Sequence, residues 1–220
     1  MHLLPEGRQG HARLKALLST PDGELADFEA LYRSVGADLG KLPWATLAPR
    51  PQIVAWLDTL GLAAERRALV VGCGVGDDAE ELARRGYRVT AFDISPTAIR
   101  WCRTRFPDST VDYAVADLLD LTAEWRQAFD VVVEFNTIQS IELGRRRDVL
   151  AAIAATVAPR GLLFVRAALR PDGAPAQSRP WPVSRAELAD FAEVGLRAVS
   201  FEMAPNPATG HPGLVAVYTR

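Results

Sequence analysis

From residue 68 onward, short hydrophobic runs alternate with longer segments in which apolar residues recur at helical spacing. This alternation is typical of a parallel β-sheet with helices on both faces. The expected strands are Ala68–Gly72, Arg88–Asp93, Val111–Ala116, Asp130–Asn136 and Gly161–Ala168. The expected helices between them span about residues 77–85, 96–106, 120–127 and 145–158. The pattern therefore predicts a fold of the α/β class.

Two further strands are expected near the C-terminus, over Arg197–Ala204 and Gly213–Thr219. The connector between them is rich in turn-forming residues and far too short for a helical crossover, so it can only join antiparallel neighbours. The chain is thus expected to form a Rossmann-like, doubly wound, seven-stranded sheet, mostly parallel with an antiparallel C-terminal hairpin strand. Ser184 and Glu187 have the spacing of a capping box and predict a last helix that runs to about Val194.

The first 67 residues are expected to be helical. Apolar residues recur at roughly helical spacing over Ala12–Leu18, Leu25–Val35 and Ile53–Leu60, with prolines between these segments. A chain of 220 residues is expected to hold one domain with a short extension. We therefore divide it into an N-terminal helical extension, residues 1–67, and a ligand-binding sheet domain, residues 68–220.

Composition and charge narrow the classes of function. Hydrophobic residues make up 49% and charged residues 24% of the chain, as in ordinary globular proteins. Twenty-five Lys and Arg stand against 27 Asp and Glu, which gives a net charge of −2 and no overall positive field to attract DNA or RNA. The run Arg145–Arg147 is expected to lie on a solvated helix start. We therefore expect no nucleic-acid partner.

The two cysteines, Cys73 and Cys102, fall in a glycine-rich turn and a helix, which forms neither a disulfide framework nor a metal-binding spacing. The three histidines also lack metal-ligand spacing, so no metal is expected. The charged N-terminus has no signal-peptide core, and no apolar run approaches the ~18 residues of a membrane span. We expect a cytoplasmic protein that does not associate with membranes. The sequence does not indicate its oligomeric state.

The most informative segment is the glycine-rich turn Gly72–Gly76, which follows a hydrophobic strand and opens a helix. Glycines there let the chain turn sharply and let a ligand approach the backbone. Asp93 ends the next strand 21 residues after Gly72, where a carboxylate can accept hydrogen bonds from both hydroxyls of a ribose. Asp117 follows the third strand and is placed to meet the exocyclic amine of an adenine. Three adjacent strand ends are therefore expected to hold one nucleoside.

Several ligands compete for such a turn. A dinucleotide fingerprint has its third glycine where this chain has Asp77, and a carboxylate at that helix N-terminus repels a pyrophosphate. S-adenosylmethionine carries a sulfonium and an ammonium cation and no phosphate, so acidic residues favour it. No Gly-Lys-Ser/Thr follows the turn, which excludes a Walker loop. The alternative without a ligand is a merely tight connection with Asp93 as a cap, but turn, spacing and carboxylates together favour the cofactor.

The segment from Ala68 to Ile99, with its Gly-Cys-Gly-Val-Gly-Asp-Asp turn and the later Phe-Asp-Ile-Ser-Pro, resembles the class I S-adenosylmethionine-dependent methyltransferases. Within them it is most similar to the branch of thiopurine and tellurite-resistance methyltransferases, which act on small molecules. The resemblance covers about residues 40–168 and implies that Leu42–Trp44 folds over the cofactor. The cofactor-binding residues that it implies are Gly72, Cys73, Gly74 and Gly76 around the methionine moiety, Asp93 at the ribose, Ile94 on the adenine with Ser95 beside it, and Asp117 and Leu118 at the adenine edge.

The methyl acceptor is expected beyond the carboxyl end of the fourth strand. The segment that follows this strand lacks the Asn/Asp-Pro-Pro-Tyr/Phe tetrad of enzymes that methylate amino groups of DNA and protein. Glu134 is a candidate catalytic residue and equally an ordinary polar residue at a strand end. Phe135, Asn136 and Gln139 are candidate acceptor-binding residues, although the two amides can also simply cap the turn.

Arg166, near the end of the fifth strand, is a second candidate catalytic residue, because its guanidinium can meet an anionic or strongly polar acceptor. Residues 170–182 form a long loop and hence a candidate lid, whose Trp181 can stack on the acceptor. A solvated loop with ordinary arginines is the alternative. With Trp44 from the N-terminal segment, these residues predict a small, largely apolar pocket with one cationic wall.

Methyl transfer is an in-line displacement, which requires a nucleophile held about 3 Å from the methyl carbon, aligned and stripped of water. No general base is evident apart from Glu134, which favours a sulfur, nitrogen or acidic oxygen atom of a small molecule as the acceptor. The alternative is a protein that binds S-adenosylmethionine without turnover, as a regulatory or partner subunit.

Overall fold

The computed structural model describes residues 24–61, 63, 65–176, 179–205 and 210–220. They contain a seven-stranded sheet with the order β3-β2-β1-β4-β5-β7-β6. Strands β1 to β5 run parallel to one another, and β7 runs antiparallel to both β5 and β6. The strands are β1 (Arg67–Val71), β2 (Arg88–Asp93), β3 (Asp112–Val115), β4 (Phe129–Phe135), β5 (Val157–Ala168), β6 (Arg197–Met203) and β7 (Gly213–Thr219). The predicted Rossmann-like sheet and its C-terminal hairpin are confirmed.

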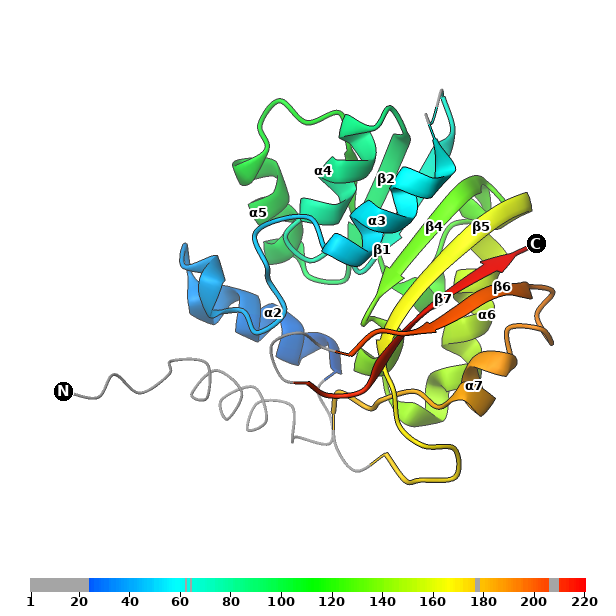
Figure 1. Ribbon diagram of the computed structural model, residues 1–220. Helices are drawn as coiled ribbons and strands as arrows, with labels where there is room; N and C mark the ends of the chain where they lie inside the picture. Colours follow the sequence, from blue (N-terminus) through cyan, green and yellow to red (C-terminus); the bar gives the residue numbers. More distant parts are fainter. Residues whose placement is uncertain (1–23, 62, 64, 177–178, 206–209) are drawn as a thin grey trace.

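Helices cover both faces of this sheet (Figure 1). Helices α3, α4 and α5 pack on one face and α6 and α7 on the other, while α2 lies near the edge at which the parallel strands end. Their bounds are α2 (Glu24–Val35), α3 (Pro51–Leu60), α4 (Asp77–Arg84), α5 (Pro96–Arg105), α6 (Arg146–Thr156) and α7 (Arg185–Ala189). Among the described helices none is long and apolar enough to cross a lipid bilayer. The helix predicted for Ala12–Leu18 lies outside the described residues.

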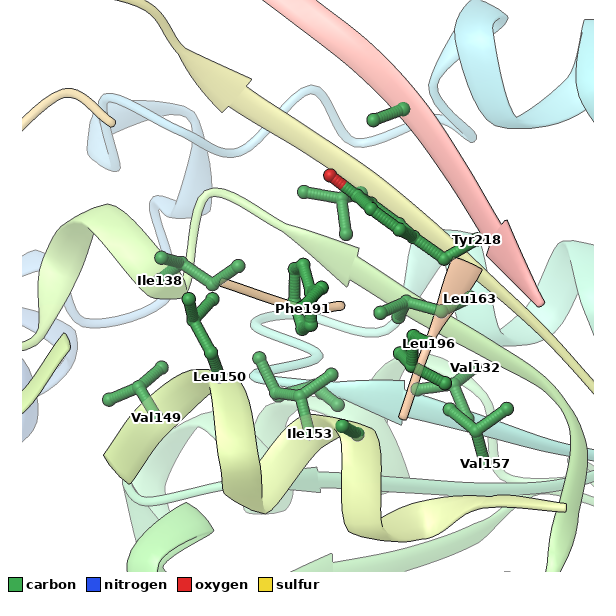
Figure 2. Close-up of a cluster of buried hydrophobic side chains, with 14 of the residues drawn as sticks. Val132, Ile138, Val149, Leu150, Ile153, Val157, Leu163, Phe191, Leu196 and Tyr218 are labelled. Carbon is green, nitrogen blue, oxygen red and sulfur yellow. The ribbon is translucent and has the colours of Figure 1, made fainter. Parts of the chain in front are cut away.

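The central strands are buried on both faces, as their continuous apolar sequence predicts. Val70 and Val133 pack with α3 and α4, whereas Val71 and Val132 pack with α6, because consecutive residues of a strand point to opposite faces. Figure 2 shows the second of these clusters, in which side chains of α6 lie close to the ring of Phe191. The two buried faces fix the sheet rigidly, so the residues that follow each strand are held in defined places.

The α-helix predicted for residues 120–127 is wrong. The chain forms two short 3-10 helices instead, η2 (Leu118–Asp120) and η3 (Ala123–Trp125). Asp117 begins the first by accepting a hydrogen bond from the backbone N–H of Leu119 at 2.9 Å. The ring of Trp125 packs against Phe92 and Phe129, with centroids 5.4 and 6.1 Å away. The packing of this partly buried ring against the core overrides the helical spacing of so short a segment.

Helix α7 is shorter than predicted. Its capping box is confirmed, because Ser184 accepts a hydrogen bond from the N–H of Glu187 and Glu187 accepts one from the N–H of Ser184. The helix ends at Ala189 rather than near Val194, since the turns that follow place Phe191 fully inside the core. The capped N-terminus of α7 lies next to the loop 170–182, because the N–H of Ala186 donates to the carboxylate of Asp172.

Candidate functional site

The glycine-rich turn connects β1 to α4 in a backbone shape that other residues rarely adopt. Gly72, Gly74 and Gly76 have φ angles of 61°, 59° and 96°. A Cβ on Gly72 would lie 2.3 Å from Oγ1 of Thr137, and one on Gly76 would lie 2.6 Å from Oη of Tyr113. Neighbouring side chains therefore approach the turn so closely that glycine is required at both positions.

Asp93, the last residue of β2, ties this turn to α5. One carboxylate oxygen accepts a hydrogen bond from the N–H of Gly74 at 3.0 Å, and the other accepts one from the N–H of Ser95 at 3.0 Å. The side chain is buried, and this burial raises the pKa of Asp93 to about 6, although the backbone hydrogen bonds act to lower it. Each oxygen accepts one of these two hydrogen bonds, which leaves acceptor capacity for hydroxyl groups.

The hydroxyl of Ser95 forms its hydrogen bonds within the protein. This buried hydroxyl caps α5 by accepting from the N–H of Ala98 at 3.1 Å, and it donates to Glu29 of α2 at 2.5 Å. Glu29 also accepts from the backbone N–H and the hydroxyl of Thr97. Ser95 therefore fastens α2 to the start of α5, directly beside Asp93.

The end of β3 joins the same place. The N–H of Ala116 donates to the carbonyl of Asp93 at 3.1 Å, and the N–H of Cys73 donates to the carbonyl of Phe92 at 2.8 Å. Asp117 is half-buried and Leu118 buried, directly after this strand. The structure thus brings together the predicted cofactor residues from three neighbouring strand ends.

Two aromatic side chains from the N-terminal segment lie against the turn. The indole N–H of Trp44 donates to Oη of Tyr32 at 3.2 Å, and the two rings pack edge to face. A Cβ on Gly74 would lie 3.4 Å from Oη of Tyr32 and 3.9 Å from Nε1 of Trp44. Burial raises the pKa of Tyr32 well above its usual value, so its hydroxyl stays protonated. The sequence analysis missed Tyr32, which showed only as an apolar position in the 25–35 helix.

The two acidic residues that open α4 are both paired with arginines. Asp77 accepts two hydrogen bonds from Arg105 of α5, at 2.7 and 3.0 Å, and Asp78 forms an ion pair and hydrogen bonds with Arg50. The carboxylate of Asp77, which the sequence offers as a reason against a pyrophosphate at this helix N-terminus, is thus paired with the guanidinium of Arg105. Asp77 and Asp78 instead anchor neighbouring elements to the helix that carries the glycine turn.

On the β4–β5 side, three predicted acceptor-site residues meet. The guanidinium of Arg166 lies 5.2 Å from the ring centre of Phe135, and its Nη1 donates to Oδ1 of Asn136 at 2.6 Å. Arg50 lies on the same ring at 4.0 Å and donates to the backbone carbonyl of Trp44 at 3.1 Å. Arg50, which sequence reasoning missed, connects the glycine turn to this cluster. No local pattern marked it, since only the fold brings the residue before α3 next to β4.

Glu134 is fully buried at the end of β4. One carboxylate oxygen accepts from the N–H of Ile138 at 2.9 Å, and the other has no hydrogen-bond partner. Burial raises the pKa of Glu134 to about 7, against the effect of backbone hydrogen bonds and of Arg146 and Arg166. Such a pKa suits proton transfer near neutral pH. The side chain nevertheless reaches no solvent in this structure.

The loop 170–182 is attached to the end of β4 through Gln139 and Arg146. Oε1 of Gln139 accepts from the N–H of Ala168 at 2.5 Å, and its backbone carbonyl accepts from the N–H of Trp181 at 2.7 Å. Arg146 donates to the backbone carbonyls of Ile138 and, at 3.0 Å, of Trp181. Trp181 therefore lies beside the segment that follows β4.

The solvated position expected for the whole run Arg145–Arg147 is wrong for its middle member. Arg146 is 5% exposed and also faces Glu187 at 3.7 Å, whereas Arg145 and Arg147 are exposed. At the start of a helix only some side chains point toward the core. Here Arg146 points inward, where it donates hydrogen bonds to two backbone carbonyls. Within the part of the chain that the structure describes, no cluster of three or more His, Cys, Asp or Glu side chains could hold a metal ion.

The fold and the site define the class of protein. A glycine-rich turn after the first strand, carboxylates after the next two strands and the order β3-β2-β1-β4-β5-β7-β6 form the architecture of the class I S-adenosylmethionine-dependent methyltransferases. The sequence of residues 68–161 matches the methyltransferase domain family. Residues 68–161 therefore resemble a methyltransferase domain, in a fold that S-adenosylmethionine-dependent methyltransferases share. These observations do not distinguish the thiopurine and tellurite-resistance branch from others.

Known proteins of this class resemble the chain over most of its length. It is 34% identical over 147 residues to a ubiquinone biosynthesis O-methyltransferase of Xanthomonas oryzae pv. oryzae, and the match covers 64% of this chain and 59% of that protein. A protein solved in work on the conversion of a disulfide bond into a thioacetal group during echinomycin biosynthesis is 28% identical. Its structure has a TM-score of 0.71, and the match covers 88% of this chain and 90% of that one. The N-methyltransferase NodS from Bradyrhizobium japonicum WM9, solved with S-adenosyl-L-homocysteine, is 22% identical, with a TM-score of 0.69 and coverage of 88% and 97%.

Proposed function

We propose that the chain transfers a methyl group from S-adenosylmethionine to a small-molecule acceptor. The observation that carries this proposal is the meeting of Asp93, the glycine turn and Asp117 at three neighbouring strand ends. The domain match over residues 68–161 supports it. S-adenosylmethionine supplies an activated methyl group, since the acceptor's lone pair bonds to the methyl carbon while the sulfonium–methyl bond breaks and its electron pair remains on sulfur.

The residues at the strand ends fit this cofactor. The carboxylate of Asp93 has acceptor capacity left for the two ribose hydroxyls, and Ile94 and Leu118 offer apolar surface to the adenine. The carboxylate of Asp117 accepts a hydrogen bond from the exocyclic amine of the adenine. The backbone of the glycine turn approaches the methionine moiety without a Cβ in the way. Ser95 contributes by holding the loop in place, because its hydroxyl is already used twice.

We also propose that the N-terminal extension covers the cofactor. Tyr32 and Trp44 lie against Gly74, and Glu29 binds the start of α5 beside Asp93. These contacts support a position of α2 and of the segment before α3 over the cofactor. Both elements would close off water from the sulfonium, which favours an in-line attack.

The acceptor is proposed to lie among Trp44, Phe135, Asn136 and Arg166, with Trp181 closing the far side and Gln139 holding it there. A sulfur, nitrogen or acidic oxygen nucleophile fits, because it needs little help in losing a proton. The relative from Xanthomonas is named an O-methyltransferase and the echinomycin neighbour acts on a disulfide, so oxygen and sulfur are the first atoms to test. Glu134 is the candidate base for an acceptor that must lose a proton.

The experiment is a measurement of S-adenosylhomocysteine release. Purified full-length chain is mixed with S-adenosylmethionine and separate panels of thiols, phenols and amines. Release that depends on one acceptor class supports the proposal. The alternative, a regulatory or partner subunit that binds S-adenosylmethionine without turnover, predicts tight binding by calorimetry and no release with any panel. The cytoplasmic location and the lack of a nucleic-acid partner remain predictions from composition and charge.

A further inference from the structure

We propose that the methyl acceptor carries a carboxylate and that the guanidinium of Arg166 binds it at the carboxyl end of β5. This inference rests on the proposed methyl transfer and names the class of its acceptor. That class is a small organic acid whose nucleophilic atom lies close to its carboxylate, so that one anchored anion positions the atom that attacks.

Arg166 is a buried cation without an ion pair. The residue is 5% exposed, its Nη1 donates to the neutral amide of Asn136, and its Nε is buried without a hydrogen-bond partner. No carboxylate among the residues that the structure describes forms a salt bridge with it. Removing a guanidinium from water is costly unless an anion compensates it, so the site lacks an anionic partner.

Glu134 is the acidic residue that interacts electrostatically with Arg166, but its side chain is on the other face of the sheet. Phe135 is opposite Arg166 in the β4–β5 register, on the side where Phe164 packs with α3 and α4. Glu134 is opposite Val165, which belongs to the α6 cluster. Because consecutive strand residues point to opposite faces, the carboxylate of Glu134 is directed toward α6 and cannot serve as the partner.

A second guanidinium adds positive charge at the same ring. Arg50 lies 4.0 Å and Arg166 5.2 Å from the ring centre of Phe135. Arg50 is held in place by Asp78 and by the carbonyl of Trp44, on the side of the glycine turn. Burial, together with the charge of Arg50, lowers the pKa of Arg166. Of these two neighbouring cations, only Arg50 is paired with an acid, Asp78. The remaining positive charge attracts one more anion.

The free edge of Arg166 indicates the shape of this anion. Since Nη1 is used by Asn136, the Nε and Nη2 groups remain as two parallel donors, and Nε is buried without a hydrogen-bond partner. Two parallel donors match the two oxygens of a carboxylate. A Cβ on Gly213 would lie 3.4 Å from Nη2 but only 2.5 Å from the carbonyl oxygen of Ala204, so β7 passes close to this edge at a position that requires glycine. The ring of Phe135 supplies an apolar wall for the rest of the acid.

The test compares benzoate with its neutral analogue benzamide. Calorimetric titrations use the full chain saturated with S-adenosylhomocysteine. We expect benzoate to bind at least about tenfold more tightly than benzamide, which corresponds to about 1.4 kcal/mol. Arg166→Gln should abolish this preference while the affinity for S-adenosylhomocysteine changes by less than about threefold. The control Arg88→Gln removes an exposed arginine at the start of β2 and should change neither affinity.

A second variant keeps the test decisive if Arg166→Gln does not fold. Asn136→Asp places a carboxylate where the amide oxygen now lies, 2.6 Å from Nη1 of Arg166. This internal anion should remove the preference for benzoate and leave the fold intact. In a turnover assay, 2-mercaptobenzoate should release S-adenosylhomocysteine faster than thiophenol with the natural sequence, and the ratio should fall toward one in Asn136→Asp.

Three results would overturn the inference. Equal affinity for benzoate and benzamide would show that the site does not select for a negative charge. Tighter binding of phenylphosphonate than of benzoate would show that the site prefers an anion other than a carboxylate. A loss of S-adenosylhomocysteine affinity in Arg166→Gln shows that the guanidinium serves the cofactor's own carboxylate. A natural chain that binds no S-adenosylhomocysteine contradicts the proposed function itself, and this outcome is distinct because it appears before any acid is added.

Discussion

The carboxylate of Asp93 accepts a hydrogen bond from the backbone N–H of Gly74 at 3.0 Å, which fastens the end of β2 to the turn that follows β1. A side chain so placed can bind ribose hydroxyls and hold the turn open for the methionine moiety at once. We expect Asp93→Ala to weaken S-adenosylmethionine binding by about 2–3 kcal/mol, because two hydroxyl donors of the ribose lose a charged acceptor. Calorimetry with purified variants measures this.

The matched control is Asp58→Ala, which removes an exposed aspartate from α3 on the same face of the sheet. Its cofactor affinity should equal that of the natural chain. If Asp93→Ala folds and also binds with unchanged affinity, the ribose is held elsewhere and the assignment of Asp93 fails.

Glu134 predicts a dependence of stability on pH. Burial raises its pKa from 4.5 to about 7 in the folded protein. Between these pH values the folded state binds the proton more tightly than the unfolded state, so stability falls as pH rises through this window. The fall amounts to at most about 3 kcal/mol. Glu134→Gln has no proton to lose and should lack it.

Urea unfolding of both proteins between pH 4.5 and 8 provides the measurement. Asp93 also has a raised pKa, but it is present in both proteins, so the difference between the two curves isolates Glu134. Above pH 7 the glutamine variant should be the more stable protein. Parallel curves would show that the carboxylate of Glu134 is not buried in the way that the structure indicates.

The strands and the glycine turn could be predicted because their signals are local. Val131–Val133 is a continuous apolar run, and the Gly72–Gly76 turn carries its own backbone requirement in its residue types. Arg146 could not be predicted, since three consecutive arginines look alike until the fold brings two backbone carbonyls to one of them. Arg50 likewise depends on Asp78 and the β4 end, which only tertiary packing places beside it.

The errors have the same origin. Residues 120–127 have helical spacing, but the ring of Trp125 packs against Phe92 at the edge of the core, and the chain forms only 3-10 helices. The sequence shows the carboxylate of Asp77 but not its pairing with Arg105, which is far away in the sequence and next to it in space. Local pattern thus predicts the elements well, whereas the pairing of charged side chains depends on contacts between distant segments.

Arg146 is expected to hold the loop 170–182 against the end of β4. Arg146→Met removes hydrogen bonds to the carbonyls of Ile138 and Trp181 and leaves both buried acceptors without a donor. We expect a loss of about 2–4 kcal/mol in the free energy of unfolding. The amide of Trp181, which donates to Gln139, should also exchange its hydrogen faster.

Arg147→Met is the control from the same triplet, since its side chain is 78% exposed. It should change stability by no more than about 0.5 kcal/mol. Urea denaturation and hydrogen exchange of both variants decide the matter. Equal effects of the two substitutions would mean that the loop is held by other contacts, such as the bridge between Leu169 and Val183.

The last prediction separates the roles of two tryptophans at opposite sides of the site. Trp44 lies against Gly74 and donates to Tyr32, whereas Trp181 lies in the loop 170–182 and bonds to Gln139 through its backbone. Trp44→Ala should therefore weaken S-adenosylhomocysteine binding, by about tenfold, because it removes the wall over the glycine turn. Trp181→Ala should impair turnover or raise the acceptor KM while cofactor affinity stays nearly the same, since its backbone binds the segment after β4, where we propose the acceptor. Calorimetry with S-adenosylhomocysteine and an S-adenosylhomocysteine release assay, run on both variants, give the two readouts. If Trp181→Ala weakens cofactor binding as much as Trp44→Ala does, the loop belongs to the cofactor site and its role as a lid over the acceptor is wrong.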